Sequence, residues 1–232
     1  MHGSKKQLSR WLLAIWWLCA NNTDTSAKNL QRLLQLSSYQ TAWTWLQKLR
    51  MAMGTADHAA CHGVVEMGCA PVLPAWQKPE PALVVAAAEI ILPAGITGRI
   101  KMVMINRLEA ASINTFVQTA VTPGSSVFAP GLPAYRDLEQ QGYLYVSAAG
   151  RDNPLRAAQL IKAFEIWLNK VHRGGVTRKH LQLYLNEFCF HSNSAMLPNL
   201  EAIFNLLLEG VLTHKPKPYR QLVAGSWPLV SQ

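Results

Sequence analysis

Basic side chains gather in two parts of the sequence, and their chemistry suits the phosphates of nucleic acid. Arginine and lysine bind phosphate through charge-assisted hydrogen bonds, which position a protein on a nucleic-acid backbone. The first group consists of Lys28, Arg32, Lys48 and Arg50. The second group consists of Lys170, His172, Arg173, Arg178, Lys179 and His180. We expect the first group and Arg173, Arg178 and Lys179 to contact DNA phosphates, and we interpret the two histidines as structural.

Polar side chains near residue 40 could read the edges of DNA bases. Ser26 is a suitable N-cap for a first short helix, and a break at residues 35–37 leads into a second helix over 38–53. Two short helices with a tight connection are typical of a helix-turn-helix motif. Its recognition helix would present Tyr39, Gln40, Thr41 and Thr44 in its first turns. For each of these residues, a solvated helix surface is the alternative interpretation.

The composition favours a folded protein with a polyanionic partner. Half of the 232 residues are hydrophobic, 15% are charged, and the formal net charge is +9. The high hydrophobic content and low charged content exclude a disordered tail. The positive net charge favours nucleic acid as the partner. The cysteines contain no C-x-x-C pair, which argues against a zinc ribbon. We therefore expect ordinary thiols, and neither a bound metal ion nor a cofactor.

An apolar run near the N-terminus has some features of a signal peptide. Lys5, Lys6 and Arg10 precede the run over residues 11–20. That run has about half of the ~20 residues that a membrane-spanning helix needs. It is also rich in tryptophan and lacks a cleavage site of the A-x-A type. We expect a buried helix, no membrane partner, and a cytoplasmic protein that joins the nucleoid when bound to DNA.

The periodicity of apolar residues changes near residue 60 and predicts an α/β protein. Residues 1–54 read as a helical, helix-turn-helix-like module, and residues 55–63 read as a linker. Strands are predicted over 64–67, 82–92, 98–105, 125–128 and 143–146, with helices over 109–121, 155–171, 177–190 and 196–212. This order suits a ribonuclease-H-like mixed sheet with flanking helices over residues 64–213. Residues 214–232 are predicted to form an extended tail.

Several motifs in order resemble the transposases of the insertion-sequence 1595 family, a DDE-type family. The segments that carry the resemblance are 26–34 and 38–50, then 123–127 and 131–135 with Gly142-Tyr143, then 172–176 and 179–188. The resemblance covers about residues 7 to 223. It implies a zinc ribbon ahead of the helical DNA-binding part, followed by a ribonuclease-H-like catalytic domain. This chain carries no residues that match the ribbon.

The resemblance also implies DNA cleavage and strand transfer with two Mg²⁺ ions held by carboxylates. The two family aspartates fall here on Gly68 and Pro130, and neither residue has a side-chain oxygen. The third acidic position lies on the helix near 158–165, where this chain has Ala158, Ala163 and Glu165. The arginine-rich run that follows in the family is replaced by residues 190–194. These departures predict a degenerate active site.

Three hypotheses follow from these residues. The first is a transposase homologue that binds DNA without cutting it. The second is an active, Mg²⁺-dependent transposase with a displaced site, for which Glu66, Glu165 and Glu187 are the weak candidates. The third is a repurposed, non-enzymatic module that binds a protein or a nucleic acid. The family resemblance also implies self-association.

Overall fold

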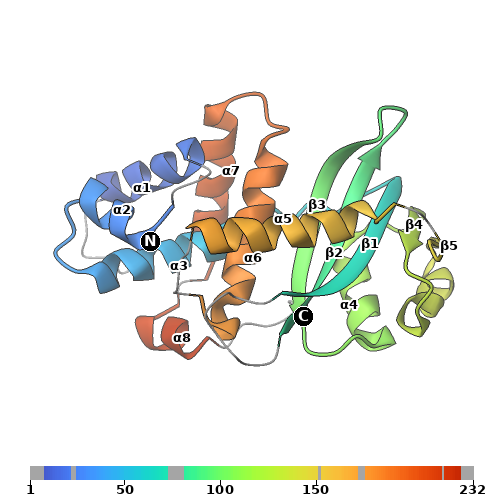
Figure 1. The fold of residues 1–232 in the computed structure, drawn as a ribbon. Coiled ribbons are helices and arrows are strands. Elements are labelled where there is room, and N and C mark those ends of the chain that lie inside the picture. The colour runs from blue at the N-terminus through green and yellow to red at the C-terminus, as the bar shows by residue number, and fades with distance from the viewer. Residues whose placement is uncertain are drawn as a thin grey trace. The chain divides into compact units, whose positions relative to one another are not determined.

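The chain folds into two compact units, one helical and one built around a sheet (Figure 1). The structure, a computed structural model, describes residues 8–21, 25–72, 81–150, 153–171, 176–215 and 217–225. The helical unit combines residues 8–58 with residues 179–225, and the sheet unit is formed mainly by residues 59–170. The division differs from the predicted one, in which residues 64–213 formed a single domain. The helices after residue 179 pack with the N-terminal helices instead.

The helical unit is built around one long central helix. Its helices are α1 (Leu8–Ala20), α2 (Ala27–Leu33), α3 (Tyr39–Ala56), α6 (Leu181–Ser194), α7 (Leu200–Thr213) and α8 (Tyr219–Ala224). A short 3-10 helix, η2 (Arg178–His180), precedes α6. Helix α3 packs against α2, α6, α7 and α8, and the stacked rings of Trp11 and Trp45 join it to α1 with centroids 3.8 Å apart. Most of α3 is therefore buried.

Small residues allow the helices of this unit to approach closely. A Cβ atom added at Gly210 of α7 would lie 2.4 Å from the carbonyl oxygen of Ala52 in α3. Gly54, which we placed at the end of the first module, lies inside α3 and faces the side chain of Asn186. The predicted linker is therefore wrong at its start, because α3 continues to Ala56.

The structure confirms one sequence-based prediction for the helical unit and contradicts another. The Ser26 side chain accepts a hydrogen bond from the Asn29 amide at 3.2 Å, so the predicted N-cap is confirmed. The prediction of an extended tail is wrong for residues 219–224, which form α8 with Leu222 fully buried. None of the described helices has the length and apolarity needed to span a bilayer.

The sheet unit contains a mixed sheet in the order β3-β2-β1-β4-β5. Its strands are β1 (Val64–Val72), β2 (Ala82–Ile91), β3 (Ile96–Ile105), β4 (Ser126–Ala129) and β5 (Leu144–Ser147). The first three form an antiparallel meander, and β4 and β5 join β1 in parallel. This topology is the predicted ribonuclease-H-like one. The first strand is longer than the predicted 64–67 and includes Gly68.

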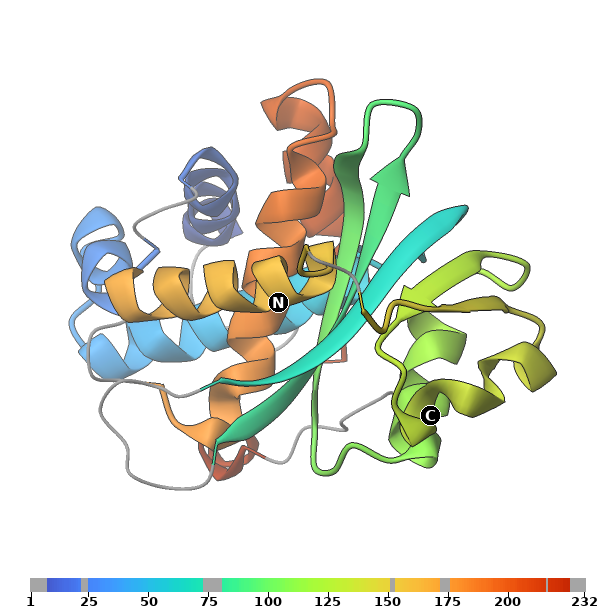
Figure 2. The same cartoon turned by 45° about the vertical axis from the view of Figure 1, so that its right-hand side comes forward.

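Helices cover the two faces of this sheet. Helix α4 (Ala110–Ala120) and the 3-10 helix η1 (Pro133–Gln141) share a core with Val65 and Met67 of β1. Because side chains alternate along a strand, Glu66 and Gly68 point to the opposite face. Helix α5 (Arg156–Val171) begins beside the strands (Figure 2), and its first turn meets that second face at Gly68. The helix buries Ala157, Ile161, Phe164 and Leu168 at helical spacing.

Candidate functional site

The two positions that the resemblance assigns to aspartates lie on neighbouring parallel strands. The register pairs Val64 with Ser126 and Glu66 with Phe128. Continued in the same register, Gly68 lies opposite Pro130, which directly follows β4. The fold therefore brings together the positions where two carboxylates could share metal ions. It places a glycine and a proline there.

Helix α5 approaches the sheet closely at Gly68. A Cβ atom added at Gly68 would lie 3.4 Å from the Cβ of Ala157 and 3.7 Å from the amide nitrogen of Ala158. Both Gly68 and Ala157 are buried. The first turn of α5 therefore lies directly beside position 68, at an ordinary contact distance for an added Cβ atom. A longer side chain here would have to fit between β1 and this turn.

The other side chains near these positions are poor metal ligands or proton carriers. Burial raises the pKa of the Cys69 thiol to about 11, so the thiol stays protonated. The Tyr145 hydroxyl donates a hydrogen bond to the carbonyl oxygen of Pro130 at 3.1 Å. Burial also raises the pKa of Tyr135, whose hydroxyl is enclosed in the core. The thiol and the two hydroxyl groups around these positions therefore serve packing and do not form an ion-binding site.

Glu66 anchors the start of α5. Its Oε2 atom accepts a hydrogen bond from the backbone amide of Arg156, the first residue of that helix. A carboxylate at this place satisfies one of the free amides of the first turn and complements the helix dipole. The weak catalytic candidate Glu66 therefore has a clear structural role.

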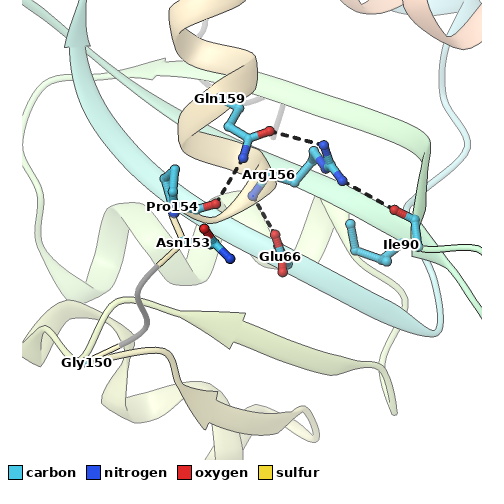
Figure 3. A pocket seen from close by; sticks show the side chains of 8 residues that line it. Glu66, Ile90, Gly150, Asn153, Pro154, Arg156 and Gln159 are labelled. Carbon is cyan, nitrogen blue, oxygen red and sulfur yellow. Dashed lines mark hydrogen bonds between the residues drawn. The ribbon is translucent and has the colours of Figure 1, made fainter.

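An open pocket of about 610 Å³ lies beside Glu66 (Figure 3). Its lining includes the polar side chains of Asn153, Arg156 and Gln159, together with Gly95 from the turn between β2 and β3. The Arg156 guanidinium donates to Gln159 Oε1 at 3.1 Å and to the carbonyl oxygen of Gly95 at 3.3 Å. Sequence reasoning missed these residues, because Arg156 stands alone rather than in a basic cluster.

Glu165 lies well away from Gly68. It is eight residues beyond Ala157 on α5, which corresponds to roughly 12 Å along the helix axis. Its carboxylate pairs with the ammonium of Lys162 at 2.7 Å on the helix surface. The structure therefore does not bring Glu165 together with Glu66 or with the positions of Gly68 and Pro130.

The predictions for Glu187 and Arg50 are wrong. Glu187 lies on α6 in the helical unit, and its Oε2 atom is 2.7 Å from Nε of Arg50 on α3. The Thr25 hydroxyl also donates to Glu187, and the Arg50 guanidinium lies 4.1 Å from the ring centroid of Tyr184. Arg50 is 2% exposed and Glu187 is fully buried, so neither reaches a DNA phosphate or a metal ion from solvent.

The residues at these positions do not fit the two Mg²⁺ ions that the resemblance implies. Magnesium prefers carboxylate oxygens and water, whereas Gly68 and Pro130 offer no side-chain oxygen. Across the described ranges, no three histidine, cysteine, aspartate or glutamate side chains are grouped so that they could hold a metal ion.

The predicted DNA-binding residues of the helical unit form two small exposed groups. Lys28 and Arg32 are four residues apart on α2, so they lie on the same helix face, and both are exposed. Tyr39 and Gln40 are exposed in the first turn of α3, where Tyr39 is 57% accessible. The buried body of α3 could not enter a DNA groove along its length, but its N-terminal turn is accessible.

Three further residues of this unit that we predicted to bind DNA are less accessible to a DNA molecule. Thr41, Thr44 and Lys48 are all half-buried. The Thr44 hydroxyl donates to the backbone carbonyl of Gln40 at 2.7 Å. This bond within the helix occupies the hydroxyl proton that a base contact would use.

The second basic group is only partly described. Arg173 lies outside the described residues, and Arg178 is half-buried. Lys179 is exposed, but its ammonium donates to the carbonyl oxygen of Val223 at 2.7 Å and so ties η2 to α8. His180 is buried, packs against the Trp43 ring and hydrogen-bonds the Leu222 carbonyl, as expected for a structural histidine.

The family model of the ISXO2-like transposase domain matches residues 74–193, which is more than half of the chain. The match includes Pro130 and α5, and it begins after Gly68. A search of curated proteins found no match.

Proposed function

Because the chain belongs to the ISXO2-like transposase family, we propose that it binds DNA and does not cleave it. The observation that carries this proposal is the pair of neighbouring positions Gly68 and Pro130. In a ribonuclease-H-like sheet these strands adjoin, so they are the place where metal-binding carboxylates would have to converge. The contact between Gly68 and Ala157 also supports the proposal, because position 68 is buried beside the first turn of α5.

The accessible basic residues of the helical unit support DNA as the partner. Lys28 and Arg32 lie on one face of α2, and the exposed first turn of α3 follows α2 in the chain. The amides at the start of a helix attract phosphate, and side chains there reach base edges in DNA-binding proteins. We infer that Lys28 and Arg32 contact phosphates and that Tyr39 and Gln40 lie against the DNA. Self-association is a further expectation from the family.

The salt dependence of DNA binding tests this proposal. Each phosphate contact contributes roughly 0.9 to the slope of log K against log salt concentration. The double variant Lys28→Ala/Arg32→Ala should therefore lower the slope by about 2 and weaken binding to all duplexes alike. Fluorescence anisotropy with a labelled duplex, between low and physiological salt, measures both quantities.

The matched control removes two exposed cations from the sheet unit. Arg136→Ala/Lys162→Ala lowers the net charge by the same amount, and both residues are exposed. If the control and the α2 variant reduce the slope equally, binding reflects net charge alone and the assignment to α2 is wrong. A wild-type slope near zero would reject DNA binding through phosphates.

A further inference from the structure

The turn between β2 and β3 presents apolar side chains to solvent at the end of a projecting hairpin. Leu92 and Ile96 are 64% and 55% exposed, and Ile91 beside them is 40% exposed. In the register of the sheet, Ile90 pairs with Val64, the first residue of β1. The hairpin therefore continues past the start of β1, and Figure 2 shows its turn projecting from the sheet. Exposed apolar groups in such a place indicate a contact surface.

The tip of this hairpin is held in a defined conformation. The amide of Gly95 donates to the carbonyl oxygen of Ile91 at 2.9 Å, and the φ of Gly95 is +64°, which favours glycine. The Arg156 guanidinium holds the Gly95 carbonyl, and Glu66 in turn holds the Arg156 amide. These bonds fix the hairpin turn to the start of α5. A fixed apolar tip loses little conformational entropy when it binds.

The charges near the hairpin favour an anionic partner. Arg156 lies on the α5 face of the hairpin. Arg99 and Lys101 follow the turn on β3, in phase with Val103 and Ile105 on the α4 face. The two nearby carboxylates accept hydrogen bonds from backbone amides, Glu89 from His62 at 3.1 Å and Glu66 from Arg156, and these bonds do not cancel their charge. The three cations, of which Arg99 and Lys101 are half-buried, therefore exceed these two acidic groups by one.

We propose that this hairpin is a second DNA-contacting element, in which Leu92 and Ile96 form an apolar wedge that inserts between base pairs from the minor groove. Apolar side chains that enter the groove unstack a base step, and flanking cations bind the phosphates on either side. The tip supplies the wedge, and Arg99, Lys101 and Arg156 supply the cations. The inference rests on the proposed DNA binding and adds a base-unstacking step to it.

A fluorescent base analogue tests the wedge directly. A 30-base-pair duplex of mixed sequence with 2-aminopurine at a flexible TA step reports unstacking as a rise in fluorescence. Wild-type protein should raise this fluorescence on binding. The variant Leu92→Ser/Ile96→Ser should bind about tenfold more weakly and give no rise, because it lacks the inserted apolar groups. Both residues are exposed, so the variant should fold as the wild type does.

The matched control is Leu144→Ser, which removes a leucine of equal exposure, 64%, from the edge strand β5 of the same unit. It should behave as wild type in both readouts. If salt-dependent binding is retained but wild type and Leu92→Ser/Ile96→Ser give the same fluorescence, the wedge is overturned while DNA binding stands. If wild type does not bind the duplex at all, the proposed function fails, and the wedge fails with it.

An anionic lipid surface is the competing partner for an apolar tip with flanking cations. Sedimentation with phosphatidylglycerol vesicles separates the two. Vesicle binding that is lost in Leu92→Ser/Ile96→Ser, with an unchanged 2-aminopurine signal, would assign the tip to lipid and overturn the wedge. If the wild type does not bind vesicles and Leu92→Ser/Ile96→Ser loses the fluorescence rise, the wedge is supported.

Discussion

Gly68 stands where the family resemblance assigns an aspartate, and it also has a packing role. Without a side chain it offers no carboxylate at this position, and it lets the buried Ala157 rest on the strand. A substitution at Gly68 would therefore add a side chain directly beside the first turn of α5.

Gly68→Asp should destabilise the protein without creating nuclease activity. Its Cβ would meet Ala157 at an ordinary contact distance of 3.4 Å, but its carboxylate would be placed at a buried position beside α5, at a cost of about 1–3 kcal/mol. Urea unfolding followed by circular dichroism measures this cost, with Gly68→Ala as the smaller control. Unchanged stability, or Mg²⁺-dependent nicking of DNA, would contradict the packing described at this contact.

The buried pair Arg50–Glu187 has a structural role in place of the predicted DNA and metal contacts. Burial lowers the pKa of Arg50, but Glu187 and Tyr184 together raise it by more, so the net shift is upward and the guanidinium stays charged. Removal of one partner leaves an uncompensated buried charge. The pair thus joins α3 to α6 in the core of the helical unit.

Arg50→Met should cost about 3–5 kcal/mol of stability, and Arg50→Met/Glu187→Leu should cost less than that single variant. The reason is that the double variant leaves no unpaired charge. Urea midpoints of both variants measure the difference. For the folded Arg50→Met protein, the slope of log K for DNA binding against log salt concentration should equal that of the wild type. A slope lower by about 1 would show that Arg50 contacts a DNA phosphate.

At the scale of elements, periodicity predicted most helices and strands and the order of the sheet. The boundaries that failed depend on contacts distant in sequence. Glycine is typical of helix ends, yet Gly54 lies inside α3, where the Asn186 side chain of α6 packs against it. The prolines of the tail favour an extended segment, but residues 219–224 form α8, in which Leu222 is buried. The location of Gly68 and Pro130 opposite each other follows from the fold, but the approach of Ala157 required the structure.

Gly210→Ala tests the close packing of α3 and α7. Alanine favours an isolated helix over glycine by about 1 kcal/mol, so propensity alone predicts stabilisation. The added Cβ would lie 2.4 Å from the Ala52 carbonyl oxygen, so we expect the helices to separate and the protein to lose about 2 kcal/mol or more. Thermal unfolding compares it with Glu209→Ala, an exposed neighbour on α7. Stabilisation by Gly210→Ala would refute this contact.

For the whole molecule, histidines of the helical unit link stability to pH. Burial lowers the pKa of His180, His191 and His214 below the ordinary value of 6.5. Each is therefore neutral in the folded state under conditions where the unfolded chain already binds a proton. The free energy of unfolding should be highest above about pH 6.5 and should fall as the pH drops below that value.

Chemical denaturation at pH 7.5 and pH 5.5 measures this dependence. His191→Gln should lessen the loss of stability at the lower pH, because it removes one of the groups that protonate on unfolding. His58→Gln, at an exposed histidine of the same unit, serves as the control. Equal stability at the two pH values would show that these histidines are accessible to protons in the folded protein.

The central claim for the whole molecule is that a transposase fold binds DNA without cutting it. Incubation of supercoiled plasmid with Mg²⁺ or Mn²⁺, at a protein concentration where anisotropy shows saturated binding, tests it most directly. We expect no nicking above the metal-free control. Metal-dependent nicking by the wild type that disappears in Glu66→Gln or Glu165→Gln would contradict it.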